Sequence, residues 1–221
     1  YLEPNNADID GDGRPNVNDT DDDGDGTPTA NEQPNGGLNP TDSDGDGVPD
    51  TAEVLLGTDP MVADTDGDGQ NDLADADPTF MANPIDTSGA PATFAIKEAL
   101  VENNFDYAAN KTANDHLELL VTNSGAAPLT GFSVYYSIKD GDSGKTEGTF
   151  RKLDGFSVPA GGEARIHFDD GVVAGHFRAN PNSIYTTSQA AKTFSVMLKA
   201  DGFAPVSVEI AKDKGGAEAA D

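Results

Sequence analysis

The sequence contains neither cysteine nor tryptophan among its 221 residues. Without cysteine the chain can form no disulfide bond, no thiolate zinc site and no cysteine nucleophile. Without tryptophan it lacks the side chain that most often stacks on sugars. Stability must therefore come from an apolar core, from bound metal, or from both.

Basic residues are also scarce, because 13 Lys and Arg stand against 40 Asp and Glu and give a formal net charge of −27. This balance excludes a nucleic-acid binder that works through a basic surface. The longest apolar stretches, such as residues 54–56, are far too short to span a bilayer, so we expect no membrane insertion. Tyr1 opens the chain without a Met, a basic segment or an apolar segment. We therefore expect that an export signal has been removed or that the chain is a fragment.

The negative charge is concentrated at the front of the chain. Residues 1–86 hold 23 acidic residues and a single base, Arg14, whereas residues 87–221 hold 17 acidic and 12 basic residues. Large apolar residues are sparse in the front segment, so it cannot bury enough apolar surface to offset chain entropy unaided. Composition alone would suggest a disordered acidic linker. The order of the residues argues against that interpretation.

Four twelve-residue frames with the pattern Asp-x-Asp-x-Asp-Gly recur in residues 1–86, and each closes on an acid at its twelfth position. Their first, third, fifth and twelfth positions are Asp8, Asp10, Asp12 and Asp19; Asp21, Asp23, Asp25 and Glu32; Asp42, Asp44, Asp46 and Glu53; and Asp64, Asp66, Asp68 and Asp75. This spacing is typical of the twelve-residue calcium loop.

The spacing follows from the chemistry of a hard cation, which takes about six to eight oxygen ligands. A chain that curls around the ion turns positions 1, 3 and 5 inward, and Gly at position 6 permits the sharp reversal. Position 7 offers its backbone carbonyl, from Arg14, Thr27, Val48 and Gln70. Position 9 reaches the ion directly or through water, from Asn16, Thr29, Asp50 and Asp72. Zinc and copper would prefer nitrogen or sulfur ligands, and the front segment has neither His nor Cys.

The four frames differ in quality. The third, residues 42–53, matches fully and is followed by a short helical exit that stops at Gly57. The second keeps Glu32 but has Thr29 at position 9, while the first and fourth close with the shorter Asp, so we expect weaker binding there. A second register that begins at Asp19 would place Ala30 at position 12 and is not the principal frame, although Asp19 and Asp22 stay candidates for bridging neighbouring ions. We expect about four calcium ions in total.

The front segment resembles the thrombospondin type-3 repeat, an EF-hand-like calcium array of extracellular proteins. The resemblance covers roughly residues 5–80 and includes the linking phrases at residues 56–60 and 75–78. It implies that bound calcium forms the centre of the segment and that the protein is extracellular or on the cell surface. We expect calcium to stiffen this segment into a spacer, because it is otherwise crowded with unscreened carboxylates.

From about residue 92 the chain alternates apolar and polar residues, with turn residues every eight to twelve positions. Leu117, Leu119 and Val121 should face one way, and Phe132, Val134, Tyr136 and Ile138 repeat the pattern. Further strands are predicted at residues 92–101, 146–153, 163–168, 184–188, 192–199 and 205–211. About eight short strands predict an all-β sandwich, immunoglobulin-like or jelly-roll. Residues 121–134 resemble the strand, Asn-x-Gly turn and strand of bacterial Ig-like adhesin repeats and of carbohydrate-binding modules.

Little in the sandwich suggests an enzyme. His116 and His167 fall on the polar side of predicted strands, and His176 lies in a polar loop at residues 175–181. The adjacent acids Asp169 and Asp170 should diverge rather than face each other. A glycan site could use Tyr135, Tyr185 or Phe177 as stacking faces, with Arg178 and Asn180 as hydrogen-bond partners.

We therefore predict calcium-binding repeats at residues 1–86, a β-sandwich at 87–212 and a loose tail at 213–221. The favoured function is a structural one, in which a calcium-stiffened spacer carries a sandwich used for adhesion or surface assembly. The alternatives are a carbohydrate-binding accessory module of a secreted enzyme and a subunit of a self-assembling surface filament. The expected partners are calcium and another copy of the chain, a surface protein or a glycan.

Overall fold

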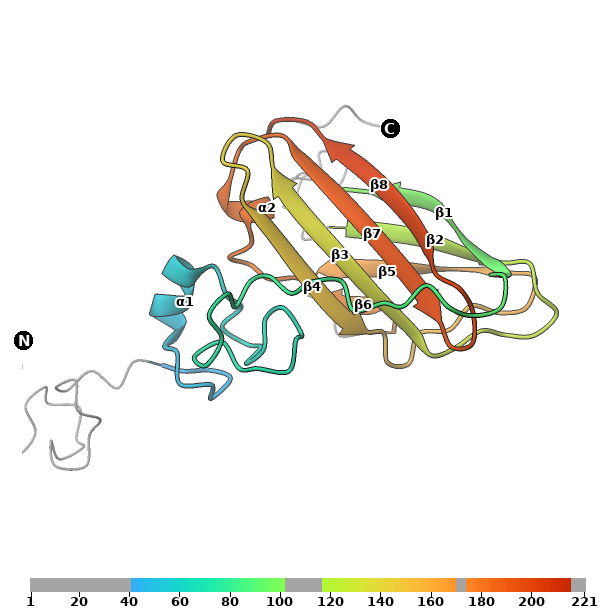
Figure 1. Ribbon diagram of the computed structural model, residues 1–221, viewed down its shortest axis with the longest axis horizontal. Helices are drawn as coiled ribbons and strands as arrows, with labels where there is room; N and C mark the ends of the chain where they lie inside the picture. Colours follow the sequence, from blue (N-terminus) through green and yellow to red (C-terminus); the bar gives the residue numbers. More distant parts are fainter. Residues whose placement is uncertain (1–40, 102–116, 170–173, 216–221) are drawn as a thin grey trace, which may run out of the picture.

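The computed structural model describes residues 41–101, 117–169 and 174–215, and Figure 1 shows two sheets packed face to face. One sheet has the strand order β1-β2-β5-β6 and the other β4-β3-β7-β8. The predicted β-sandwich is thus confirmed. The strands are β1 (Phe94–Leu100), β2 (Leu117–Asn123), β3 (Phe132–Asp140), β4 (Thr146–Lys152), β5 (Glu163–Asp169), β6 (His176–Arg178), β7 (Lys192–Ala200) and β8 (Val206–Lys212).

Neighbouring strands pair antiparallel, with the exception of the parallel pair β5 and β6. The predicted strands that are confirmed begin and end within about two residues of the observed bounds. Alternation located β2 and β3, for example, because every second residue of these strands faces the core and is buried.

Two segments differ from the sequence prediction. The strand predicted at residues 184–188 is wrong, because Ile184–Thr187 form the short helix α2. Ile184 and Tyr185 are neighbours in sequence and both are buried. The Ser183 hydroxyl caps this helix by accepting the Tyr185 backbone N–H at 3.1 Å. Conversely, β6 lies in the predicted polar loop, and its three residues are too few to show a period.

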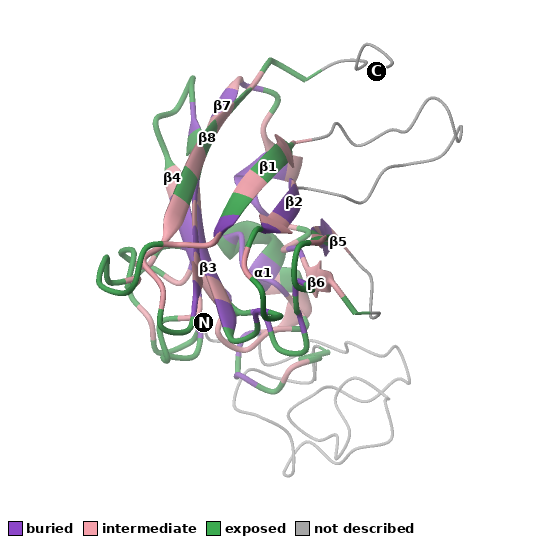
Figure 2. Cartoon of the chain, turned by 90° about the vertical axis from the view of Figure 1, so that its right-hand side faces the viewer, coloured by how far each residue is buried: buried purple, intermediate pink, exposed green. Residues whose placement is uncertain are grey.

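The core lies between the two sheets and is built from the inward positions of both. Figure 2 shows the buried residues following the strands, whereas many exposed residues lie in the connections. The aromatic rings meet edge to face, as in the Phe94 and Phe132 pair, whose centroids are 5.4 Å apart. The inward set includes the predicted positions, and its most deeply buried members are Leu119, Val121, Val134, Ile166, Phe168, Phe194 and Leu198.

The described part of the acidic segment lies beside β4 and β6 at one end of the sandwich (Figure 1). It contains the short helix α1 (Asp50–Leu56) and little other regular structure. The chain then crosses the outer face of the second sheet, where the Lys199 ammonium lies 2.7 Å from the Asp86 carboxylate and Ala90 bridges Phe203. The predicted domain boundary at residue 87 falls within this crossing.

The predicted tail is described only as far as Gly215, whose N–H donates to the carbonyl of Gln189 at 3.0 Å. Among the residues that the structure describes, no helix is long and apolar enough to cross a membrane.

Candidate metal centre

Loop 3, residues 42–53, folds over its first carboxylate. The Asp42 carboxylate accepts hydrogen bonds from the N–H of Gly45 at 2.8 Å and of Gly47 at 3.1 Å. Gly47 has a φ of 98°, in the left-handed region that residues with a Cβ rarely adopt. Glycine at the sixth position therefore allows the reversal that the spacing predicted.

Loop 4, residues 64–75, has the same geometry. The Asp64 carboxylate accepts the N–H of Gly67 at 2.9 Å, of Asp68 at 3.2 Å and of Gly69 at 3.0 Å. Gly69 again has a φ of 98°. Two stretches of sequence thus fold into one local structure because they share the spacing of Asp and Gly.

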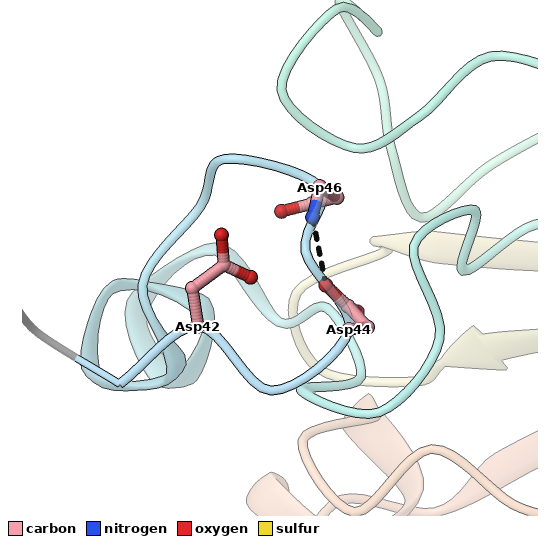
Figure 3. A group of neighbouring side chains, drawn as sticks. All are labelled: Asp42, Asp44 and Asp46. Atoms are coloured by element: carbon pink, nitrogen blue, oxygen red, sulfur yellow. Dashed lines mark hydrogen bonds between the residues drawn. The ribbon is translucent and has the colours of Figure 1, made fainter.

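At the third and fifth positions of loop 3, a local hydrogen bond fixes each carboxylate. Oδ1 of Asp44 accepts the N–H of Asp46 at 3.1 Å, as Figure 3 shows, and Oδ1 of Asp46 accepts the N–H of Val48 at 2.6 Å. In loop 4, Oδ1 of Asp66 accepts the N–H of Asp68 at 2.9 Å. One ligand atom from each of Asp42, Asp44 and Asp46 lies within 4.8 Å of the others, and the same holds for Asp64, Asp66 and Asp68.

Four buried carboxylate oxygens near these loops have no hydrogen-bond partner. They are Oδ2 of Asp44, Oδ2 of Asp46, Oε2 of Glu53 and Oδ2 of Asp66. A buried anionic oxygen without a partner costs free energy that the fold must recover elsewhere. A bound cation would supply the missing partner, so the residues present fit a metal ion.

Glu53, the predicted twelfth-position ligand of loop 3, lies in helix α1. The helix ends at Gly57, whose N–H donates to the Glu53 carbonyl at 2.7 Å. The Glu53 side chain is fully buried, and its Oε1 accepts the Thr58 hydroxyl at 3.2 Å. Leu55, in contrast, is 88% exposed. The helix therefore turns its acid inward and an apolar side chain outward, opposite to an ordinary surface helix.

The electrostatics of both loops favour a cation. Burial and, to a smaller extent, the nearby carboxylate of Asp44 together raise the pKa of Glu53 to about 7. Burial likewise raises the pKa of Asp66 to about 7, with repulsion from Asp68 and Asp75. The metal-free loops thus disfavour their own negative charge, and a divalent cation would reverse that balance.

The ninth-position carboxylates, Asp50 and Asp72, hydrogen-bond to the second residue of their own loops. Both oxygens of Asp50 are engaged by Ser43, whose N–H and hydroxyl donate at 2.8 Å each. Asp72 likewise accepts the Thr65 N–H at 2.9 Å and its hydroxyl at 2.7 Å. Ligation of the ion by Asp50 and Asp72 stays a prediction. Their partners Ser43 and Thr65 were not predicted from the sequence, although both loops have a hydroxyl residue at the second position.

The two loops contact each other and form one unit. The Asn71 side-chain amide donates to the Asp46 carbonyl at 3.0 Å. The side chain of Leu73 lies so close to Gly47 that a Cβ there would be 2.8 Å from Leu73 Cδ2. The charge of Asp72 also contributes to the raised pKa of Glu53. Binding of a cation in one loop should therefore change the cation affinity of the other.

The other predicted ligands of loops 3 and 4 lie around these clusters. Val48 is buried, and the Gln70 side-chain amide donates to the Asp68 carboxylate at 3.0 Å. The Asp75 carboxylate accepts the N–H of Asp77 at 2.9 Å and is only partly buried. The candidate ligands of the first two frames, residues 8–32, lie outside the described residues.

Several residues proposed for glycan binding instead contact the acidic segment. The Tyr135 hydroxyl donates to the Met81 carbonyl at 3.0 Å, and the Asn180 amide donates to the Gly57 carbonyl at 2.7 Å. Arg178 pairs with Asp59 at 2.7 Å. These side chains are therefore engaged within the chain.

The histidines within the described residues lie side by side on one sheet. The rings of His167 on β5 and His176 on β6 stack with their centroids 4.6 Å apart. Nδ1 of His176 is 2.7 Å from the carboxylate of Asp169. His116 lies outside the described residues.

The fold and the site together define a β-sandwich protein with paired acidic loops of the calcium-binding type. A family model described as the bacterial TSP3 repeat matches residues 42–63, which span loop 3 and the linker to loop 4. Acidic loops of this kind bind calcium, and such repeats are typical of secreted or surface proteins of bacteria.

Comparison with whole proteins gives only distant likenesses, and no curated protein matches the chain. A β-glucuronidase of Bacteroides uniformis is 10% identical with a TM-score of 0.29, over 44% of this chain and 11% of that chain. A DNA-bound alkylpurine DNA glycosylase of Pseudomonas fluorescens is 20% identical with a TM-score of 0.30, over 56% and 32%. A sporulation control protein of Bacillus subtilis is 9% identical with a TM-score of 0.27, over 57% and 51%. Likenesses at these TM-scores carry no information about function.

Proposed function

We propose that the protein is an extracellular structural module in which calcium ions organise the acidic segment beside a β-sandwich. The observation that carries this proposal is the set of four buried carboxylate oxygens without a hydrogen-bond partner, on Asp44, Asp46, Glu53 and Asp66. In loop 3, Asp42, Asp44, Asp46 and Glu53 would hold the ion, and in loop 4 Asp64, Asp66 and Asp68 would do so.

Calcium suits these loops better than other biological cations. The ligand set is all oxygen, which disfavours zinc and copper. Magnesium demands near-octahedral geometry and gives up its water reluctantly, whereas calcium accepts the irregular set that a chain reversal supplies. We propose about four ions in the full chain, because the frames that begin at Asp8 and Asp21 share the same spacing.

We propose a non-enzymatic role in adhesion or surface assembly for the sandwich. Support comes from the arrangement of the acidic segment. Its carboxylates cluster where the proposed ions would bind, and its linker packs on the sandwich. Such an arrangement fixes one part of a chain against another. The partner we propose is a second copy of the chain or another surface protein.

A carbohydrate-binding role is less well supported. Arg178 and Asn180, which the sequence offered as hydrogen-bond donors for a sugar, are hydrogen-bonded to Asp59 and Gly57. The buried Tyr185 offers no open stacking face. A glycan site would have to use residues other than Arg178, Asn180 and Tyr185.

Calorimetric titration of the full chain tests calcium binding directly. We expect saturable binding of several calcium ions, with magnesium binding far more weakly at the same concentrations. Glu163→Gln, which removes an exposed acid of β5 that pairs with Lys97, serves as the control and should bind like the wild-type chain. A wild-type chain that binds one ion or none would overturn the proposal.

A further inference from the structure

The linker between loops 3 and 4, residues 57–63, is held on the sandwich by an ion pair whose Asp59 side chain is buried and whose Arg178 side chain is 36% exposed. The Asp59 side chain is fully buried. Arg178, at the end of β6, donates from Nε at 2.9 Å and 2.7 Å to its two oxygens and from Nη2 at 2.7 Å. A two-pronged contact of this kind fixes both the distance and the orientation of the carboxylate.

Two amide side chains extend this contact along the linker. Asn180 donates to the carbonyl of Gly57 at 2.7 Å, and Asn182 donates to the carbonyl of Thr58 at 2.8 Å. Consecutive linker residues are thus held by alternate residues of the segment that leaves β6. We call the contacts made by Arg178, Asn180 and Asn182 the linker clasp.

The linker clasp is directly connected to both candidate calcium loops. On one side, the Thr58 hydroxyl donates to Oε1 of Glu53 at 3.2 Å. On the other side, the N–H of Asp59 donates to the Thr65 hydroxyl at 2.9 Å, and that hydroxyl donates to Asp72 at 2.7 Å. Hydrogen bonds on the side chain and on the backbone N–H of Asp59 therefore connect Arg178 to loop 4. Thr58, the residue before Asp59, contacts Glu53 of loop 3.

A second contact joins loop 4 to the edge strand β4. The N–H of Phe150 donates to the carbonyl of Asp66 at 2.8 Å. Gly67 lies against the same backbone, where a Cβ would be 2.2 Å from the Phe150 carbonyl oxygen. Further along, the N–H of Gly148 donates to the Thr79 carbonyl at 3.0 Å. The acidic segment therefore satisfies backbone groups that an edge strand would otherwise present to solvent.

We infer that Arg178 is a positioning residue for calcium, and that calcium binding in loops 3 and 4 is thermodynamically coupled to docking of the linker on the segment after β6 and of loop 4 on β4. This inference rests on the proposed calcium function. The sandwich holds Asp59 and the Asp66 backbone in place, so part of the entropy of ordering the loops is lost before the ion arrives. Coupling of this kind is reciprocal, because a clasp that favours calcium is itself strengthened by calcium.

The first test compares Arg178→Met with Arg178→Lys in calcium titrations of the full chain. Met removes the charge and both prongs, whereas Lys keeps the charge and loses the bidentate geometry. We expect the Met variant to lose at least about fivefold in affinity at two of the sites, with the Lys variant intermediate. Arg165→Met is the matched control, because Arg165 also pairs with acids from a strand of the same sheet but does not reach the loops.

The second test needs no variant and measures amide hydrogen exchange of the wild-type chain in calcium and in chelator. We expect the N–H groups of Gly148 and Phe150 to lose protection in chelator, while β7 in the centre of the sheet keeps its protection. Equal exchange at Gly148 and Phe150 in both conditions, or a folded Arg178→Met chain that binds calcium like the wild type, would overturn the coupling alone. A wild-type chain that binds no calcium would overturn both the coupling and the proposed function.

Discussion

The acidic loops and the sandwich bury opposite kinds of side chain. In the sandwich, Phe168 and Phe194 are fully buried, and removal of apolar surface from water stabilises the fold. In the acidic segment, Glu53 of loop 3 and Asp59 of the linker are equally buried, whereas Leu55 in helix α1 is 88% exposed. The two regions therefore need different sources of stability, although the chain joins them by direct contacts.

This difference shows how a segment poor in apolar residues can still specify a structure. Each loop fixes its carboxylates through hydrogen bonds to its own backbone, as Asp42 and Asp64 do, and leaves other oxygens for an ion. The local geometry comes from spacing, and in the proposed function a bound metal supplies the energy. The sandwich follows the opposite scheme, because its energy comes from the core.

The largest expected effect is the removal of calcium, which should separate the two regions. A site at a free calcium concentration 100 times its dissociation constant contributes about 2.7 kcal/mol to the folded state. Chelator should therefore release the amides of loops 3 and 4 to rapid hydrogen exchange, while the amides of β3 and β7 stay protected. Loop amides that remain equally protected in chelator would show that the loops do not depend on the ion.

A cavity in the core of the sandwich should destabilise the sandwich by a comparable free energy. Phe194→Ala removes a fully buried ring from β7 and should lower the free energy of unfolding by about 3–5 kcal/mol. Because the core does not involve the ion, urea unfolding should give a similar loss in calcium and in chelator. A loss that disappears in chelator would mean that the sandwich core itself depends on calcium.

Substitution of the acids that close the two loops should have a smaller effect, confined to calcium binding. Glu53→Gln should weaken one site by at least tenfold, about 1.4 kcal/mol, because Glu53 is fully buried with one free oxygen. Asp75→Asn should weaken its site less, since Asp75 is partly exposed and already accepts the Asp77 N–H. Calorimetric titrations that give equal losses for the two variants would argue against closure of loop 3 by Glu53.

Lower pH should weaken calcium binding. The pKa of Glu53 rises from 4.5, and that of Asp66 from 3.8, to about 7 in the folded metal-free chain. The folded metal-free state therefore binds more protons than the unfolded state between about pH 4 and 7, so its stability falls as pH rises through this window. Calcium must displace these protons, and its affinity should fall roughly threefold per proton from pH 7.5 to 6.5. Titration at both pH values measures this change, and an unchanged affinity would contradict the raised pKa values.

The turns of the acidic loops and most strands of the sandwich could be predicted from local patterns in the sequence. The position of Gly47 five residues after Asp42 predicted the turn, and the alternation of Leu117, Leu119 and Val121 predicted a strand with one buried face. Both signals lie within a few residues, where period and spacing decide the backbone.

Contacts between distant segments gave no such signal. Asp59 and Arg178 are 119 residues apart in sequence, and neither belongs to a motif that names its partner. The sequence instead suggests Arg178 as a hydrogen-bond donor for a sugar. The short strand β6 was missed for a related reason, because only its pairing with β5 defines it.

The smallest expected effect concerns a second ion pair, which is more exposed than the pair of Arg178 and Asp59. Lys97 and Glu163 lie 3.1 Å apart, and each side chain is 52% exposed. Water and salt screen such a pair, so Lys97→Met should change the free energy of unfolding by only about 0.2–1 kcal/mol and leave calcium affinity unchanged. The Asp59 side chain is fully buried and Arg178 is 36% exposed, so removal of Arg178 leaves a carboxylate that is less hydrated than that of Glu163. Urea unfolding and calcium titration of both variants compare the two pairs. If Lys97→Met lowered calcium affinity as much as Arg178→Met, the effect of Arg178 would reflect overall charge, and burial in the clasp would not be its cause.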